Sequence, residues 1–146
     1  MSNAFAVTFL RMAMDVTGAE CGMALDSEKS VLALANLTND DIEADGFAGF
    51  ANVAQAYEFN ERPHITNNMI LDPEAAPDTN TNFAALRVVI VFPLDEHGAV
   101  YIDQHISRGV IAKTDAEKLM QVADHAIASD MLGADEATLR DLYDSL

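Results

Sequence analysis

The stretch LRVVIVFPL at residues 86–94 is an almost continuous run of β-branched and aromatic side chains, which predicts a buried strand. The turn-forming residues DEHG (95–98) separate it from AVYIDQHI (99–106), in which the side chains alternate between two faces. One face takes Val100, Ile102, Gln104 and Ile106, and the other takes Tyr101, Asp103 and His105. Two strands joined by so short a turn predict an antiparallel hairpin.

Helical and strand patterns both precede this hairpin. Apolar residues recur at helical spacing over 5–16, and Gly18 stands where a helix C-cap is expected. Apolar runs at 21–26 and 31–37 predict two more strands, the second of them covered on both faces. The rest of this half predicts a loop over 38–45, a helix over 47–59 with Asp45 as N-cap, a short strand at 63–66 and a long irregular loop over 67–82.

Two helices are predicted after the hairpin. Thr114 and Glu117 have the spacing of a capping box, so the first helix is expected to begin there. Its buried stripe is expected to comprise Leu119, Met120, Val122, Ala123, Ala126 and Ile127. Gly133 ends or interrupts this helix, and 136–146 predicts another short helix or an extension of it. Hairpin-joined strands with helices at each end indicate an α+β domain around an antiparallel sheet.

Composition narrows the classes of partner. The 146 residues suit one domain, and 24 acidic against 8 basic residues give a net charge of −16. Such a charge repels phosphate backbones and anionic lipid, so we expect no nucleic-acid partner and no membrane contact by this chain. No apolar run approaches the ~20 residues that span a bilayer, and the first ten residues lack the pattern of a signal peptide. A cytoplasmic location is expected.

The segments around the hairpin resemble the GAF domain family. LRVVIVFPL resembles the family strand that ends in Pro-Leu, AVYIDQ (99–104) resembles the next strand, and residues 108–117 resemble the short loop and capped final helix. The likeness extends over roughly residues 5–130 and is to GAF domains of bacterial sensor kinases and transcriptional regulators. The cyclic-nucleotide signature of some members is missing. Cys21 stands in the first strand, whereas bilin-binding members carry their cysteine in the second half.

The resemblance implies a GAF-like, PAS-related fold. Its central antiparallel sheet would have about six strands, with the terminal helices on one face and a helix plus a variable loop on the other. We expect an N-terminal helix at 1–17, a core at 18–130 and a helical tail at 131–146. A small-molecule pocket would lie between the sheet and the variable loop, and its candidate residues are Ile65, Asn67, Met69, Phe83, Arg87, Val89, Tyr101, Asp103 and His105. No cofactor and no metal ion is expected.

Dimerisation is a further expectation, because many members pair through their terminal helices. Candidate residues for such a seam are Phe5, Phe9, Met12 or Met14, Leu119, Met120, Leu132 and Leu139. The same stripe is also what a helix packing on its own sheet would carry.

Individual side chains offer little catalytic chemistry. Cys21 could be a redox centre, but one thiol on a buried strand is more often inert packing. Asp103 and His105 share a strand face and could hold a metal ion with a third ligand; hydrogen-bonded strand residues are the favoured interpretation. Arg87 could attract an anionic ligand, although a salt bridge is favoured.

Three functions follow in order of preference. The first is a non-catalytic sensory or regulatory domain that binds a small molecule or relays a signal to an output domain. The second is a dimerisation or scaffold module with a degenerate pocket. The third is a GAF-type redox enzyme or a hydrolytic enzyme.

Overall fold

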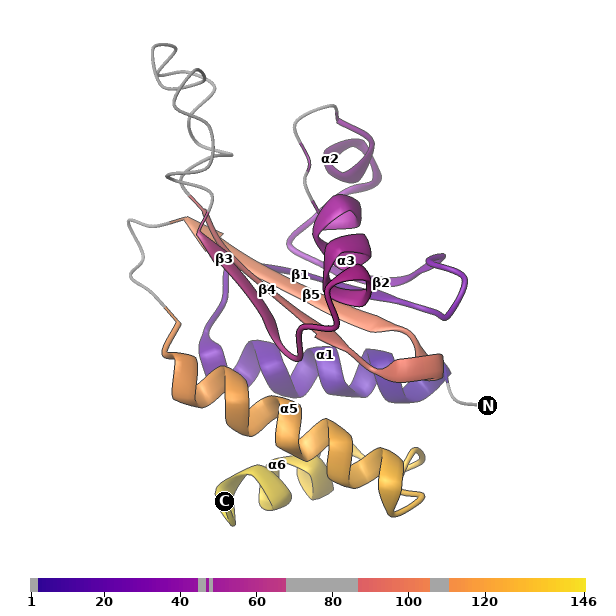
Figure 1. The fold of residues 1–146 in the computed structure, drawn as a ribbon, viewed down its shortest axis with the longest axis vertical. Coiled ribbons are helices and arrows are strands. Elements are labelled where there is room, and N and C mark those ends of the chain that lie inside the picture. Colours follow the sequence, from indigo (N-terminus) through magenta and orange to yellow (C-terminus); the bar gives the residue numbers. More distant parts are fainter. Residues whose placement is uncertain (1–2, 45–46, 48, 68–86, 106–110) are drawn as a thin grey trace.

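A computed structural model describes residues 3–44, 47, 49–67, 87–105 and 111–146 (Figure 1). The elements of the first half are α1 (Asn3–Thr17), β1 (Cys21–Leu25), β2 (Val31–Ala35), α2 (Asn39–Glu43), α3 (Gly49–Glu58) and β3 (His64–Asn67). Those of the second half are β4 (Arg87–Pro93), the 3-10 turn η3 (Asp95–His97), β5 (Ala99–His105), α5 (Lys113–Ala128) and α6 (Glu136–Asp144). Met69 and Phe83 of the predicted pocket, the N-cap Asp45 and most of the predicted loop over 67–82 lie outside the described residues.

The described strands form one antiparallel sheet in the order β2-β1-β5-β4-β3. The predicted hairpin is confirmed: β4 and β5 pair from Arg87 opposite His105 to Pro93 opposite Ala99. Gly98 closes the turn at a φ of 107°, and a Cβ there would lie 2.0 Å from the Leu25 carbonyl oxygen. The α+β class and the antiparallel sheet therefore agree with the sequence-based expectation, with five strands among the described residues.

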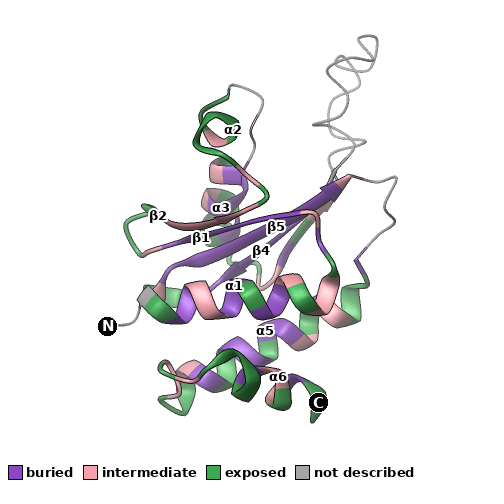
Figure 2. Ribbon diagram, turned by 180° about the vertical axis from the view of Figure 1, so that it is seen from behind, coloured by how far each residue is buried: buried purple, intermediate pink, exposed green. Residues whose placement is uncertain are grey.

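One face of the sheet is covered by α1, α5 and α6. Figures 1 and 2 show α1 next to the strands and α6 farthest from them. Ile90, Phe92, Val100 and Ile102 project from β4 and β5 into this layer, where they join one apolar cluster with side chains of all three helices. Phe9 of α1 packs edge-to-face on Phe92, with ring centroids 5.3 Å apart.

The opposite face is covered by α3. Val53 and Ala56 of this helix pack with Met23, Leu25, Val89, Val91 and Tyr101 of the sheet. Phe47 packs edge-to-face on the Tyr101 ring, with centroids 5.6 Å apart. The expectation that the terminal helices and the middle helix cover opposite faces agrees with this arrangement.

Gly22 on β1 lets α1 come close to the sheet. A Cβ at this position would lie 2.6 Å from Leu10 Cδ1 and 2.8 Å from Met14 Sδ. Because the α1 face of β1 carries no larger side chain here, two α1 side chains occupy that space. The predicted divisions 1–17, 18–130 and 131–146 pack together, since Phe5 of α1 and Leu139 of α6 belong to the same core cluster.

Three local predictions were wrong. Residues 39–43 form the short helix α2 instead of a loop, because Thr38 and Asp41 complete a capping box. Thr114 forms no such box, because α5 begins one residue earlier, at Lys113, with Ala112 at the N-cap and no side-chain cap bond. Strand β2 is an edge strand among the described strands; Ala33 packs against the helical cluster and Leu34 against the α3-side cluster, but its side chains are at most partly buried, so the predicted cover on both faces is incomplete.

Candidate functional site

The candidate site is a row of side chains on the α3 face of the sheet. Tyr101, Asp103 and His105 alternate along β5 as predicted, and Val89 lies directly opposite Asp103 on β4. Val89, Tyr101 and Asp103 are each at most 3% exposed. In Figures 1 and 2 the ends of β4 and β5 that carry Arg87 and His105 extend away from α3. The sheet thus brings four of the predicted pocket residues together.

Asp103 is a buried acidic side chain in this row. The Tyr101 hydroxyl donates a short hydrogen bond to its Oδ2. Cys21 is its register partner on β1, and the Cys21 thiol lies 3.5 Å from the Asn36 carbonyl oxygen. A buried carboxylate is costly unless it is hydrogen-bonded, so the Tyr101 hydroxyl offsets part of that cost. The hydrogen bond fixes the orientation of the two side chains on the α3 face.

Glu20 borders the row at the start of β1. Its amide donates to the Asp103 carbonyl oxygen at 3.1 Å, and its Oε1 accepts from the His105 amide at 3.2 Å. The Asn36 side-chain amide donates to the Glu20 carbonyl oxygen at 2.8 Å. These bonds hold β1, β5 and the residue after β2 together beside Asp103.

Other predicted pocket residues are placed differently. Ile65 pairs with Ile90, a residue of the helical face, so it projects to the side opposite Tyr101 and is 39% exposed. Asn67 is the register partner of Val88, which is two residues before Ile90 on β4. Arg87, by contrast, is the register partner of His105 and so occupies the next position along the row. Ile65 and Tyr101 therefore cannot line one cavity.

A second polar group on the α3 face was not predicted as a site. His64 is buried at the start of β3, with Nδ1 2.7 Å from Glu61 Oε1 and Nε2 3.2 Å from Asn52 Oδ1 of α3. His64 also lies opposite Val91, in the neighbouring row of the same face. The sequence predicts that Asn52 lies on the helix over 47–59, but no pattern in the sequence indicates that Asn52 contacts His64.

Arg62 links three separate parts of the chain. Its Nη1 lies 2.5 Å from Asp95 in the β4–β5 turn, and its Nη2 forms a short ion pair with Asp124 of α5. Burial opposes the charged guanidinium, but the hydrogen bond and charge of Asp124, with Asp95, outweigh it and raise the pKa of Arg62 above its ordinary value.

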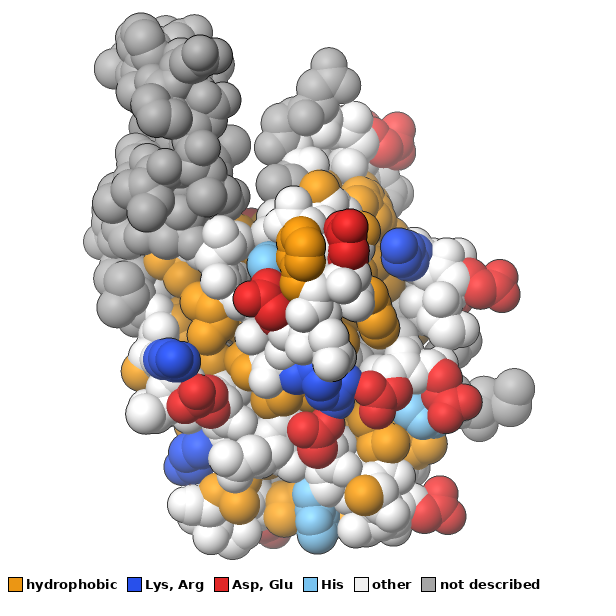
Figure 3. Space-filling view, viewed as in Figure 1, with side chains coloured by type: hydrophobic (Ala, Val, Ile, Leu, Met, Phe, Trp, Pro, Cys, Tyr) orange, Lys and Arg blue, Asp and Glu red, His pale blue; other side chains and the backbone are white. Residues whose placement is uncertain are grey.

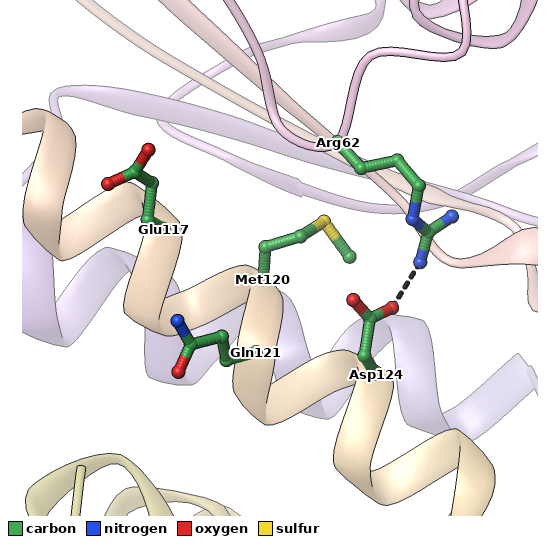
Figure 4. A pocket seen from close by; sticks show the side chains of 5 residues that line it. All are labelled: Arg62, Glu117, Met120, Gln121 and Asp124. Atoms are coloured by element: carbon green, nitrogen blue, oxygen red, sulfur yellow. Dashed lines mark hydrogen bonds and ion pairs between the residues drawn. The ribbon is translucent and has the colours of Figure 1, made fainter.

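Beside this link lies an open hollow of about 350 Å³, which Arg62, Glu117, Met120, Gln121 and Asp124 line (Figure 4). Figure 4 shows Arg62 reaching from the segment before β3 to Asp124, with Met120 beneath it. The guanidinium is occupied by two carboxylates, so its role in this arrangement is to join elements.

Tyr57 of α3 makes a similar link by hydrogen bonds. Its hydroxyl donates to the Gly98 carbonyl oxygen at 2.5 Å and reaches the Asp95 carbonyl oxygen at 3.1 Å. Burial, and then the charge of Asp95, raise the pKa of Tyr57. The hydroxyl therefore stays protonated as a donor that holds α3 to the hairpin turn.

The residues described here hold no group of three or more His, Cys, Asp or Glu side chains that could bind a metal ion. No helix within the described ranges is long and apolar enough to cross a bilayer. On the face shown in Figure 3, the few basic side chains stand singly among acidic ones.

Comparison with known proteins identifies a distant structural neighbour. No protein-family model matches the chain, and no curated protein matches its sequence. A solved structure described as "MglB with tetrameric arrangement" is similar at 17% identity over 88% of both chains, with a TM-score of 0.47.

Proposed function

We propose that this chain is a non-catalytic regulatory module that acts through self-association along the β3 side of its sheet. The observation that carries the proposal is apolar surface beside an edge strand. Ile65 on β3 is 39% exposed, and Phe59, at the end of α3, is 61% exposed. Strand β3 pairs only with β4 among the described strands. An edge strand that carries a large exposed apolar side chain favours pairing with another chain.

The terminal helices give less support for a dimer contact. Five of the side chains expected in a helical seam are fully buried inside the chain: Phe5, Phe9, Met12, Leu119 and Leu139. Side chains that already fill the core are not available to a partner. The β3 side, which has exposed apolar side chains, is therefore a better candidate for the dimer contact than the helical layer.

Arg62 supplies a route from the β3 side to the helices. It immediately precedes Pro63 and β3, and it contacts Asp124 on α5. A change in how β3 is held would alter this contact with α5. This is the relay that a regulatory module needs, since a signal requires an element that two sites both influence.

Sedimentation equilibrium of wild type and single variants tests the proposal. We expect a wild-type dimer that Ile65→Asp dissociates, because the new carboxylate would be buried in the contact. Val31→Asp is the matched control: Val31 has nearly the same exposure, 37%, and lies on the other edge strand. A wild-type monomer overturns the proposal, and so does a dimer that Val31→Asp dissociates while Ile65→Asp does not.

A second candidate function is the small-molecule sensing expected of a GAF-like domain. The buried pair of Tyr101 and Asp103 favours it. Buried polar groups stabilise a fold less than apolar side chains would, so a binding role would explain why they stand inside an apolar face. A metabolite library screened by thermal shift would find a ligand that raises the Tm of wild type. Asp103→Asn should abolish that rise, while Asp115→Asn, on α5, should preserve it. Equal rises in both variants count against this site.

A further inference from the structure

Exposed carboxylates accompany the apolar surface on the β3 side of the sheet. Phe59 stands between Glu58 and Glu61 near the end of α3, and all three side chains are exposed. From the helical layer, the exposed Glu117 of α5 lines the hollow beside Arg62, shortly before β3 begins. The surface proposed to meet a second copy is therefore negatively charged as well as apolar.

Few basic groups offset these charges. Asp95 and Asp124 both contact the Arg62 guanidinium, so two carboxylates already share its one positive charge. Lys113 lies one helical turn before Glu117 on α5 and offsets that carboxylate in part. On the face shown in Figure 3, acidic side chains lie between exposed apolar ones. The local charge thus has the same sign as the net charge of −16.

Self-association would place two such surfaces opposite each other. In a two-fold contact both copies present the same patch, so carboxylates of one copy meet carboxylates of the other. Like charges across an interface repel, and the net charge of −16 on each copy adds a repulsion of longer range. Burial of Ile65 and Phe59 favours the contact, while this repulsion opposes it.

Dissolved salt acts differently on these two contributions. The Debye length falls from about 10 Å at 0.1 M salt to about 3 Å at 1 M, so the repulsion between the copies is largely screened at the higher concentration. Apolar contacts are not weakened in this way. The direction of the salt effect is informative, because a contact held by ion pairs between the copies would weaken as salt rises.

We propose that ionic strength controls self-association along β3, so that the dimer is weak in dilute salt and stable in concentrated salt. This inference rests on the proposed function, since it concerns the regulation of the same surface. Screening depends on ionic strength and not on the identity of the ion, so the control needs no dedicated cation site. The module would respond in this way to the salt concentration of its surroundings.

Sedimentation equilibrium of the whole chain over a series of salt concentrations tests the inference. The dissociation constant of the dimer should fall at least about tenfold between about 0.1 M and 1 M NaCl. Choline chloride at the same ionic strength should have the same effect. An effect of NaCl that choline chloride does not reproduce overturns the inference, because a bound cation would then be responsible.

The same series separates this inference from the proposed function. A dimer whose dissociation constant stays constant or rises with salt overturns the control by ionic strength and leaves self-association standing. A monomer at every salt concentration overturns both.

Charge reversal at two exposed glutamates locates the repulsion. Glu58→Lys replaces the carboxylate before Phe59, and Glu28→Lys makes the same change in net charge in the turn between β1 and β2. Strand β2 lies at the opposite edge of the described sheet from β3, so Glu28→Lys is the matched control. At about 0.1 M salt, Glu58→Lys should have a dissociation constant at least about threefold below that of Glu28→Lys. Equal dissociation constants overturn the assignment of the repulsion to the β3 side.

Discussion

The two faces of the sheet bury different kinds of side chain. The face toward α1, α5 and α6 is largely apolar: Ile90, Phe92, Val100 and Ile102 are buried there, together with the polar Gln104. The face toward α3 buries Tyr101 with Asp103, and His64 with Asn52. Apolar burial stabilises without geometric demands, whereas each buried polar group needs a partner. The comparison indicates that the helical face carries most of the stability, whereas the α3 face holds two buried hydrogen-bonded pairs.

The largest expected loss of stability comes from a substitution on the apolar, helical face. Phe92→Ala should lower the free energy of unfolding by about 3–5 kcal/mol, because it leaves a cavity against Phe9. Val91→Ala, the adjacent residue on the α3 face, should lower it by about 2 kcal/mol. Urea unfolding measures both variants. A greater loss for Val91→Ala would reverse the assignment of stability to the helical face.

A smaller effect is expected within the polar row of the α3 face. Tyr101→Phe should cost about 1–3 kcal/mol, because Asp103 loses a hydrogen-bond donor while it remains buried. Tyr143→Phe removes a 3.2 Å hydrogen bond to the partly exposed Asp115 and is the matched control, with a cost below about 1 kcal/mol. A double-mutant cycle of Tyr101→Phe with Asp103→Asn measures the coupling. Additive costs would mean that the two side chains do not act as a pair.

The close approach of α1 to the sheet can be tested with Gly22→Ala. Its Cβ would displace the ends of Leu10 and Met14, and we expect a loss of about 1 kcal/mol because those ends are flexible. Gly133→Ala has open space around its Cβ and should be neutral or slightly stabilising. Thermal unfolding of both variants checks the difference. A Gly22→Ala protein as stable as Gly133→Ala would show that the packing of α1 tolerates a wider gap.

The smallest effect concerns the ion pair that connects the two sides of the sheet. Asp124→Asn should cost about 0–1 kcal/mol, since both partners are partly exposed. Asp15→Asn, which breaks the pair with Arg140 inside the helical layer, should cost a similar amount. High salt should reduce both costs. If Asp124→Asn also changes the dimer dissociation constant and Asp15→Asn does not, Arg62 couples β3 to α5.

Much of the fold was predictable because its strongest signals are local. The β-branched run at 86–94 and the alternation after it gave the β4–β5 hairpin and the correct faces of Tyr101 and Asp103. Helix α2 was missed because a five-residue helix without buried residues has no periodicity, and its capping box uses Asp41 instead of Glu. Thr114 misled because a capping box requires the threonine at the N-cap, and α5 begins before it.

The candidate site was predictable only where one strand defines it. Ile65 was placed with Tyr101 because a short strand gives no indication of its register, and a shift of one residue reverses its faces. Arg62 could not be connected with Asp95 and Asp124, which are 33 and 62 residues away along the chain. Such contacts depend on the complete fold, and no local pattern contains them.

The position of β1 in the sheet has a consequence for synthesis on the ribosome. Strand β1 lies between β2 and β5, and the helical core contains both Phe5 and Leu139. While the chain is being translated, β1 can pair only with β2 until β5 has left the exit tunnel, and α1 lacks its α6 partner for longer still. The nascent chain therefore exposes the apolar face of α1 for most of its translation. This exposure makes the incomplete chain prone to aggregation until its second half has been synthesised.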